Sequence, residues 1–96
     1  MDVSAYVAPE PAQVVVHVRI ESAARNRVLM IEWWSEDGVG GSHLVSLDGE
    51  RTAIRQDYAI TQMTAGEYIV TAVLRRDDGS DVRRNRRVIV VGEGKM

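Results

Sequence analysis

Residues 62–81, QMTAGEYIVTAVLRRDDGSD, contain the strongest fold signal in the chain. A turn-forming segment with Gly66 precedes the alternating run EYIVTAVLR (67–75), and Asp78-Gly79 then marks a second turn. The alternation places four apolar residues on one face: Tyr68, Val70, Ala72 and Leu74. The stretch is therefore predicted to form a β-strand between two turns, with one side of the strand buried.

The chain on either side reads as further short strands. Strand-type runs occupy 12–20, 27–34, 43–47, 51–60 and 82–91, and a further strand within 2–7 would end before Pro9 and Pro11. Spacings of roughly ten residues predict an all-β antiparallel sandwich of six to seven strands. Residues 21–34 also contain helix-favouring side chains, so a helix remains the alternative there.

Length and composition limit the organisation of the molecule. A chain of 96 residues suffices for one small domain, with an expected ordered core at about 12–91 and a flexible tail at 92–96. The net charge of −2 supplies no field that would attract nucleic acid, and no apolar run is long enough to span a membrane. The lack of cysteine excludes disulfides and thiol chemistry. We expect a monomer in isolation.

Tyr68 lies near the start of a predicted strand, a position at which a tyrosine can fix the preceding connection. In sandwiches of the immunoglobulin type, a tyrosine near the start of a late strand turns its hydroxyl back to an upstream main-chain group. The segment YAITQMTAGEYIV (58–70) supplies a strand ending at Ile60, a tight connection with Gly66, and Tyr68 on the inward face. We therefore predict that Tyr68 is buried, with its hydroxyl bonded to the main chain of the connection.

AGEYIVTAVLRRDDGSDVRRNRRVIVV (65–91) resembles the C-terminal half of bacterial immunoglobulin-like modules, including the polycystic-kidney-disease (PKD) type. IEWWSEDG (31–38) is similar to the tryptophan strand and acidic turn of PKD modules, although Ser35-Glu36-Asp37-Gly38 replaces their Phe-Gly-Asp-Gly run. The resemblance implies an immunoglobulin-like Greek-key fold in a surface or secreted bacterial protein. It implies a non-catalytic spacer, stalk or adhesive unit, and it transfers no catalytic residue.

The sequence contains no convincing catalytic or metal motif. His17 and His43 fall on predicted strands without metal-ligand spacing, and the serines lack a nucleophile-elbow motif. The glycines of 35–42 lack the lysine and helix of a phosphate loop, so this segment is predicted to be a flexible loop. Carboxylates at 35–38 and 77–81 raise the alternative of Ca²⁺, but Asp78-Gly79 is also a hairpin signal. We predict no enzyme activity, cofactor or metal.

The two adjacent tryptophans must point to opposite faces of their strand. Trp33 is expected in the core with Leu29 and Ile31, and Trp34 on the other face. We expect a neighbouring loop to cover Trp34. The alternative is an exposed Trp34, which would stack on a sugar or anchor a protein partner. A carbohydrate or a protein bound through exposed strands or loops is therefore a candidate partner.

Six of the 11 arginines lie in residues 75–87, around the predicted hairpin. A three-residue turn at 78–80 with Gly79 at positive φ would place Tyr68 opposite Val90 and Val70 opposite Val88. The candidate binding residues of this hairpin are Arg83, Arg84, Arg86 and Arg87. They would either protect a strand edge from pairing or bind an anionic polymer.

Overall fold

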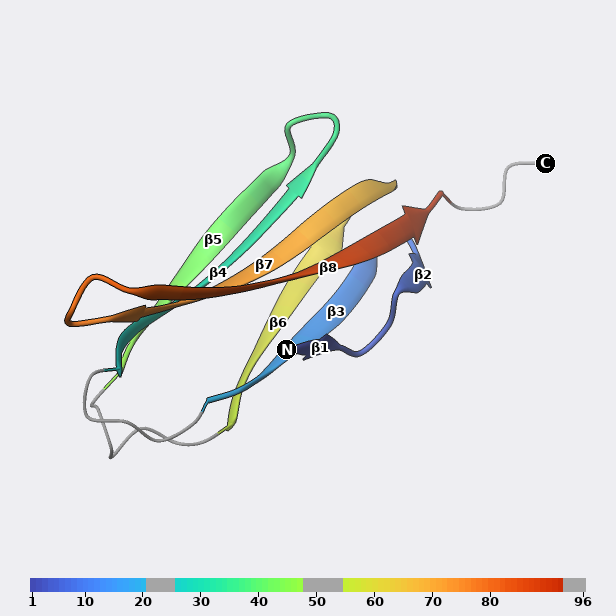
Figure 1. Cartoon of the computed structure of the whole chain (residues 1–96). Coiled ribbons are helices and arrows are strands. Elements are labelled where there is room, and N and C mark those ends of the chain that lie inside the picture. Colours follow the sequence, from blue (N-terminus) through green and yellow to red (C-terminus); the bar gives the residue numbers. More distant parts are fainter. Residues whose placement is uncertain (21–25, 48–54, 93–96) are drawn as a thin grey trace.

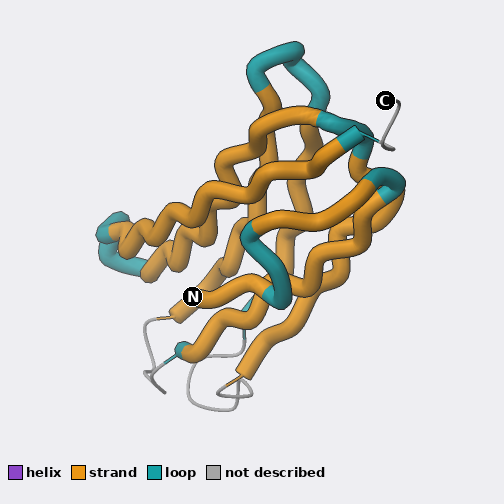
Figure 2. Tube along the Cα trace, turned by 90° about the vertical axis from the view of Figure 1, so that its right-hand side faces the viewer, coloured by secondary structure: helices purple, strands orange, loops and turns teal. Residues whose placement is uncertain are grey.

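The computed structural model describes residues 1–20, 26–47 and 55–92, and its regular elements are strands (Figures 1 and 2). A three-stranded sheet has the order β1 (Asp2–Val3), β3 (Ala12–Arg19), β6 (Arg55–Met63). A five-stranded sheet has the order β2 (Val7–Pro9), β8 (Asp81–Val91), β7 (Gly66–Arg76), β4 (Asn26–Ser35), β5 (Gly40–Ser46). The predicted all-β class is confirmed, and the two sheets form a sandwich-like arrangement.

One cluster of buried side chains joins the two sheets. Val14, Val16 and Val18 of β3 alternate with more exposed residues, as a strand with one covered face requires. Leu29 and Ile31 contribute from β4, and the predicted inward residues Tyr68, Val70 and Ala72 contribute from β7. The strand period therefore predicted the inward faces of these strands correctly.

The helical alternative for 21–34 is wrong where the structure describes it, because residues 26–34 belong to β4. Residues 21–25 of that segment lie outside the described residues. The same holds for residues 48–50 between two predicted strands, for residues 51–54 of the strand expected at 51–60, and for residues 93–96 of the tail.

The N-terminal segment differs from the prediction. Residues 2–9 form two short strands, one in each sheet, which raises the number of strands to eight in the described ranges. β2 pairs in parallel with β8, so the sandwich is not wholly antiparallel. Pro9 is the last residue of β2 rather than a residue beyond it. An edge strand tolerates this proline because its missing N–H need not join a ladder.

The β7–β8 hairpin has the predicted type of turn in a different register. Gly79 N donates to Arg76 O at 3.1 Å and Arg76 N donates to Ser80 O at 3.0 Å, so the three-residue loop is 77–79. Gly79 has a φ of 84°, as predicted. Tyr68 therefore lies opposite Val88 rather than Val90.

Local side-chain bonds explain why the loop is one residue earlier than expected. The Asp78 carboxylate accepts from Ser80 N at 2.9 Å and from Ser80 Oγ at 2.6 Å, which holds Ser80 just after the turn. Arg75 and Asp81 then face each other and form an ion pair at 3.1 Å. As a further consequence, Val70 lies opposite Arg86 rather than Val88.

Strand β6 contains a β-bulge near its C-terminal end. The register of β6 against β3 shifts between Ala12 and Val14, and Gln62 in the bulge has a φ of 59°. The extra residue lets Ile60 and Met63, three positions apart, both reach the core. β6 therefore extends to Met63 instead of ending at Ile60.

Tyr68 makes the hydrogen bond expected from the sequence. Its side chain is 1% exposed, and its hydroxyl donates to the Thr64 carbonyl oxygen at 2.9 Å. Gly66 follows the connection as the first residue of β7, with a φ of 157°. The bond ties the start of β7 to the turn that precedes it.

Candidate interaction surface

The side of the five-stranded sheet that faces away from the three-stranded sheet is here termed the outer face. Large apolar side chains gather on it, because the strand register brings outward positions of all five strands into adjacent rows. Its exposed large apolar residues are Val7, Trp34, Leu44, Ile69, Ile89 and Val91. Outward positions of a solvated sheet are normally polar, so such clustering marks an interaction site.

Three cross-strand rows make up the centre of the outer face. Each row reads from β4 through β7 to β8: Met30–Val73–Arg83, Glu32–Thr71–Asn85 and Trp34–Ile69–Arg87. The β7 positions are uncharged, the β8 positions carry arginine or asparagine, and the only charge on β4 in these rows is negative. Across these three rows the charge therefore changes from acidic on β4 to basic on β8.

Trp34 is held flat by a glycine on the neighbouring strand. Trp34 lies opposite Gly40 across β4 and β5, and a Cβ atom on Gly40 would lie 2.8 Å from the indole Cε3. The indole thus occupies the space that a side chain at position 40 would need. Trp34 is 54% exposed, so the expectation that a neighbouring loop covers it is wrong. One surface of the ring packs on the strand and the other is open to solvent.

Trp33 has the same arrangement on the inner side of the sheet. It lies opposite Gly41, where a Cβ atom would lie 2.7 Å from its Cζ2. Trp33 is partly buried and packs against the core, with its ring 5.8 Å from that of Tyr58. The predicted difference between the two tryptophans, with Trp33 the less exposed, is confirmed.

Sequence reasoning missed the role of Gly40 and Gly41. They were expected within a flexible loop at 35–42, but β5 begins at Gly40 and the connection is shorter. Ser35 N donates to Val39 O at 2.8 Å and closes this tight turn. The signal was present in the sequence as two adjacent glycines that follow two adjacent tryptophans across a short turn.

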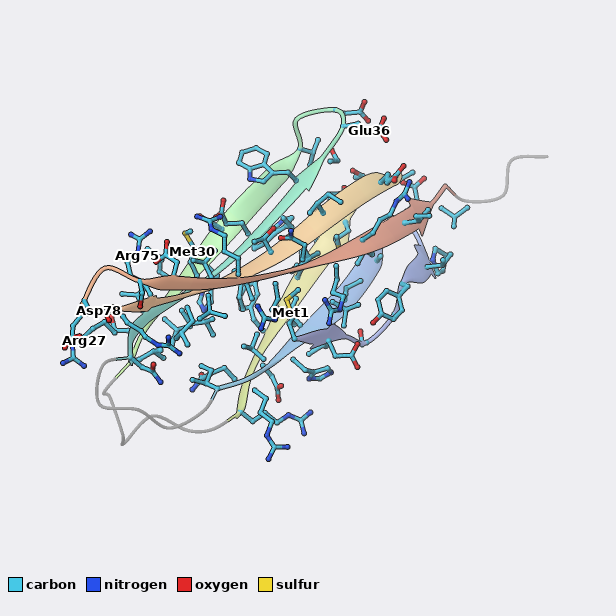
Figure 3. The ribbon with its side chains drawn as sticks, viewed as in Figure 1. Met1, Arg27, Met30, Glu36, Arg75 and Asp78 are labelled. Atoms are coloured by element: carbon cyan, nitrogen blue, oxygen red, sulfur yellow. The ribbon has the colours of Figure 1, made fainter. Side chains whose placement is uncertain are left out.

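A shallow depression of about 280 Å³ lies beside Trp34. Its lining residues are Trp34, Ser35, Glu36, Glu67 and Ile69. Glu67 forms an ion pair with Arg87 of β8. Glu36 lies at the tip of the β4–β5 connection, away from Arg75 near the β7–β8 hairpin (Figure 3). The depression combines an open aromatic ring with carboxylate acceptors.

The four candidate arginines do not share one surface. Arg83 and Arg87 point to the outer face, whereas Arg84 and Arg86 alternate to the other side of β8. Arg86 lies near Asp2, whose pKa is lowered chiefly by the hydrogen bond from Tyr6, then by Val3 N, and to a smaller extent by Arg86. The arginines of β8 are therefore divided between two environments.

The two histidines lie in unrelated places. His17 Nδ1 is 2.8 Å from Asp57 Oδ1 on the outward side of the three-stranded sheet, and Arg55 Nε donates to the same oxygen at 3.1 Å. These bonds, that of His17 first, lower the pKa of Asp57. His43 instead stacks on Tyr58, with ring centroids 4.1 Å apart.

The acidic segments considered for Ca²⁺ occupy separate turns, with Glu36 at one and Asp78 at the other (Figure 3). Within residues 1–20, 26–47 and 55–92, no three His, Cys, Asp or Glu side chains are placed to hold a metal ion. The same ranges contain no helix with the length and apolar character needed to cross a membrane. Comparison with protein-family models, curated proteins and solved structures finds no match.

Proposed function

We propose that this chain is a non-catalytic interaction module of a larger bacterial surface or secreted protein, and that it binds through the outer face. The observation that carries the proposal is the gathering of exposed large apolar side chains on one side of one sheet. Burying such side chains against a partner is favourable by about 25 cal/mol per Å² of apolar surface. The open Trp34, near the end of β4 beside the β4–β5 connection, is the natural anchor residue.

Three features support an immunoglobulin-like Greek-key class for the sandwich. The first is the strand order β1-β3-β6 against β2-β8-β7-β4-β5, and the second is the parallel pairing of β2 with β8. The third is the Tyr68 hydrogen bond to the Thr64 carbonyl, which has the form of a tyrosine corner. Because a fold does not determine a function, the proposal depends on the outer face rather than on this class.

The proposed function is tested with matched variants of the full chain used as bait in extracts of the source cells. Ile69→Gln with Ile89→Gln removes apolar surface from the outer face, and Val15→Gln alters the outward side of the three-stranded sheet as a control. Wild type and control are expected to retain the same proteins, and the outer-face variant to lose them. Equal retention by all three folded chains would contradict the proposal.

A ligand-binding accessory role is the second candidate, and the depression beside Trp34 favours a carbohydrate. A sugar ring would stack on the open indole while Glu36 and Glu67 accept its hydroxyl hydrogens. Titration with a panel of neutral oligosaccharides should then shift the tryptophan emission of the wild type and not of Trp34→Leu. A shift that persists in Trp34→Leu would exclude this site.

Binding of an anionic polymer has weaker support. Arg87 is already paired with Glu67, and the four arginines of β8 point to two sides of the sheet. Affinity for a polyanion comes from several cationic side chains that contact it together, and it falls as the salt concentration rises. The divided arginines of β8 do not offer such a joint contact. We therefore expect heparin to produce no saturable response at physiological salt.

A further inference from the structure

In place of the monomer expected from the sequence, we infer that the partner bound by the outer face is a second copy of this chain, packed face to face about a two-fold axis that runs along β7. This inference rests on the proposed function, because it uses the same surface and names its partner. A two-fold interface requires a surface that is complementary to itself. The distribution of charge around β7 meets this requirement.

Within the three central rows, the charges of the outer face lie on either side of β7. Arg83 and Arg87 lie on β8, and Glu32 lies on β4, with β7 between the two strands. Arg87 is already paired with Glu67 and Arg75 with Asp81. Among the described residues, Glu32 and Arg83 take part in none of the ion pairs. The hydrogen bond from Arg75 lowers the pKa of Asp81 most, and Arg83 lies close enough to that carboxyl to add to this effect. Neither Arg83 nor Glu32 forms an ion pair of its own within the described ranges, and a second copy would supply one to each.

A two-fold rotation about an axis along β7 places β4 of one copy opposite β8 of the other. Each cross-strand row of one copy then faces the same row of the second copy. Glu32 then faces Asn85 of the second copy and lies between its Arg83 and Arg87. Trp34 faces Arg87 of the second copy, an arrangement suited to a cation–π contact. Ile69 of each copy meets Ile69 of the other on the axis.

The packing of sheets in proteins is compatible with these contacts. Stacked sheets lie about 10 Å apart with strand directions within about 30° of each other. Glu32 and Arg83 are each one strand, about 5 Å, from the axis, so such a rotation keeps them near their partners. Two copies would therefore form two equivalent Glu32–Arg83 ion pairs.

The alternative two-fold axis in this plane runs across the strands through the Glu32–Thr71–Asn85 row. It would place Arg83 over Arg87 and Glu32 over Glu32 of the other copy. Like charges placed in this way repel and disfavour the complex. The charge pattern thus selects the axis along β7.

Charge exchange tests the proposal. Sedimentation equilibrium of the full chain should show a reversible dimer with a dissociation constant below about 1 mM. Glu32→Arg alone and Arg83→Glu alone should each weaken the dimer at least tenfold, because each places like charges together. An equimolar mixture of the two variants should recover the dimer, since one chain then carries arginine and the other glutamate at both positions.

Controls separate this result from a general effect of charge. Arg19→Glu on the three-stranded sheet should leave the dissociation constant unchanged, and all variants should keep the wild-type far-UV spectrum. A wild type that stays monomeric to about 1 mM would overturn the inference, as would a mixture that fails to restore the dimer. If either result is found while Ile69→Gln with Ile89→Gln still abolishes the capture of proteins from cell extracts, the inference of a second copy fails and the proposed function of the outer face stands.

Discussion

A side chain at position 40 has no room in this fold. A Cβ atom on Gly40 would lie 2.1 Å from the Trp33 carbonyl oxygen and 2.8 Å from the Trp34 ring. The backbone oxygen cannot move aside without breaking the β4–β5 pairing. Gly40 therefore sets both the close approach of the two strands and the flat position of the Trp34 ring.

Gly40→Ala is accordingly expected to lower the free energy of unfolding by about 2–3 kcal/mol, the cost of forced overpacking. Urea unfolding followed by far-UV circular dichroism measures the loss. Ser42→Ala, at an exposed position of the same strand, serves as the control and should change little. Equal midpoints for the two variants would show that the glycine is not required.

Tyr68→Phe removes one hydrogen bond from a buried ring and leaves the ring packing in place. The variant is expected to lose about 1 kcal/mol, the typical net contribution of such a bond, with the Thr64 carbonyl left without its partner. Thermal and urea unfolding both report this change. A variant as stable as the wild type would mean that the bond to Thr64 contributes nothing.

At the scale of elements, strands and their inward faces follow from sequence alternation, because a two-residue period is a local property. Registers do not follow in the same way. The β7–β8 turn has the expected type, but side-chain bonds between Asp78 and Ser80 place it one residue earlier. The extension of β6 to Met63 depends on the Gln62 bulge, which no sequence period marks.

The bulge leads to a prediction about backbone conformation. Gln62 has a left-handed φ of 59°, which β-branched residues adopt only at considerable cost. Gln62→Val is expected to destabilise the chain by about 1–2 kcal/mol. Gln13→Val, on the neighbouring β3, is the matched control and should be nearly neutral or stabilising. If both variants melt alike, the bulge is not fixed at Gln62.

At the scale of the whole molecule, the candidate surface was predictable only in part. The sequence indicated that Trp34 would point away from the core, and it identified the arginines as exposed. It could not show that Ile69, Ile89 and Leu44 share a face with Trp34, because that depends on the order of strands distant in sequence. The separation of Arg83 and Arg87 from Arg84 and Arg86, by contrast, follows from the alternation of side chains along β8 itself.

Acid should destabilise the folded chain through a few paired carboxylates. The pKa values of Asp2, Asp57 and Asp81 are lowered, first by hydrogen bonds from Tyr6, His17 and Arg75 respectively. Their contribution to stability is therefore present above the ordinary carboxyl pKa of 3.8 and is lost as the pH falls below it.

Melting temperatures measured between about pH 6 and pH 2 should consequently fall mainly at the acid end. Asp57→Asn should show a shallower fall than the wild type, because its carboxylate has both His17 and Arg55 as partners. Asp37→Asn, in the exposed β4–β5 connection, is the control. A fall in Asp57→Asn as steep as in the wild type would contradict this role for the carboxylate.

The central claim is that two copies of this molecule associate through the outer face. Amide chemical shifts of the ¹⁵N-labelled chain, recorded while unlabelled chain is added, test it most directly. We predict saturable shift changes in β4, β7 and β8, centred on Glu32, Ile69 and Arg83 and weakened by Arg83→Glu. Shift changes confined to the three-stranded sheet, or unchanged shifts up to about 1 mM, would contradict the account.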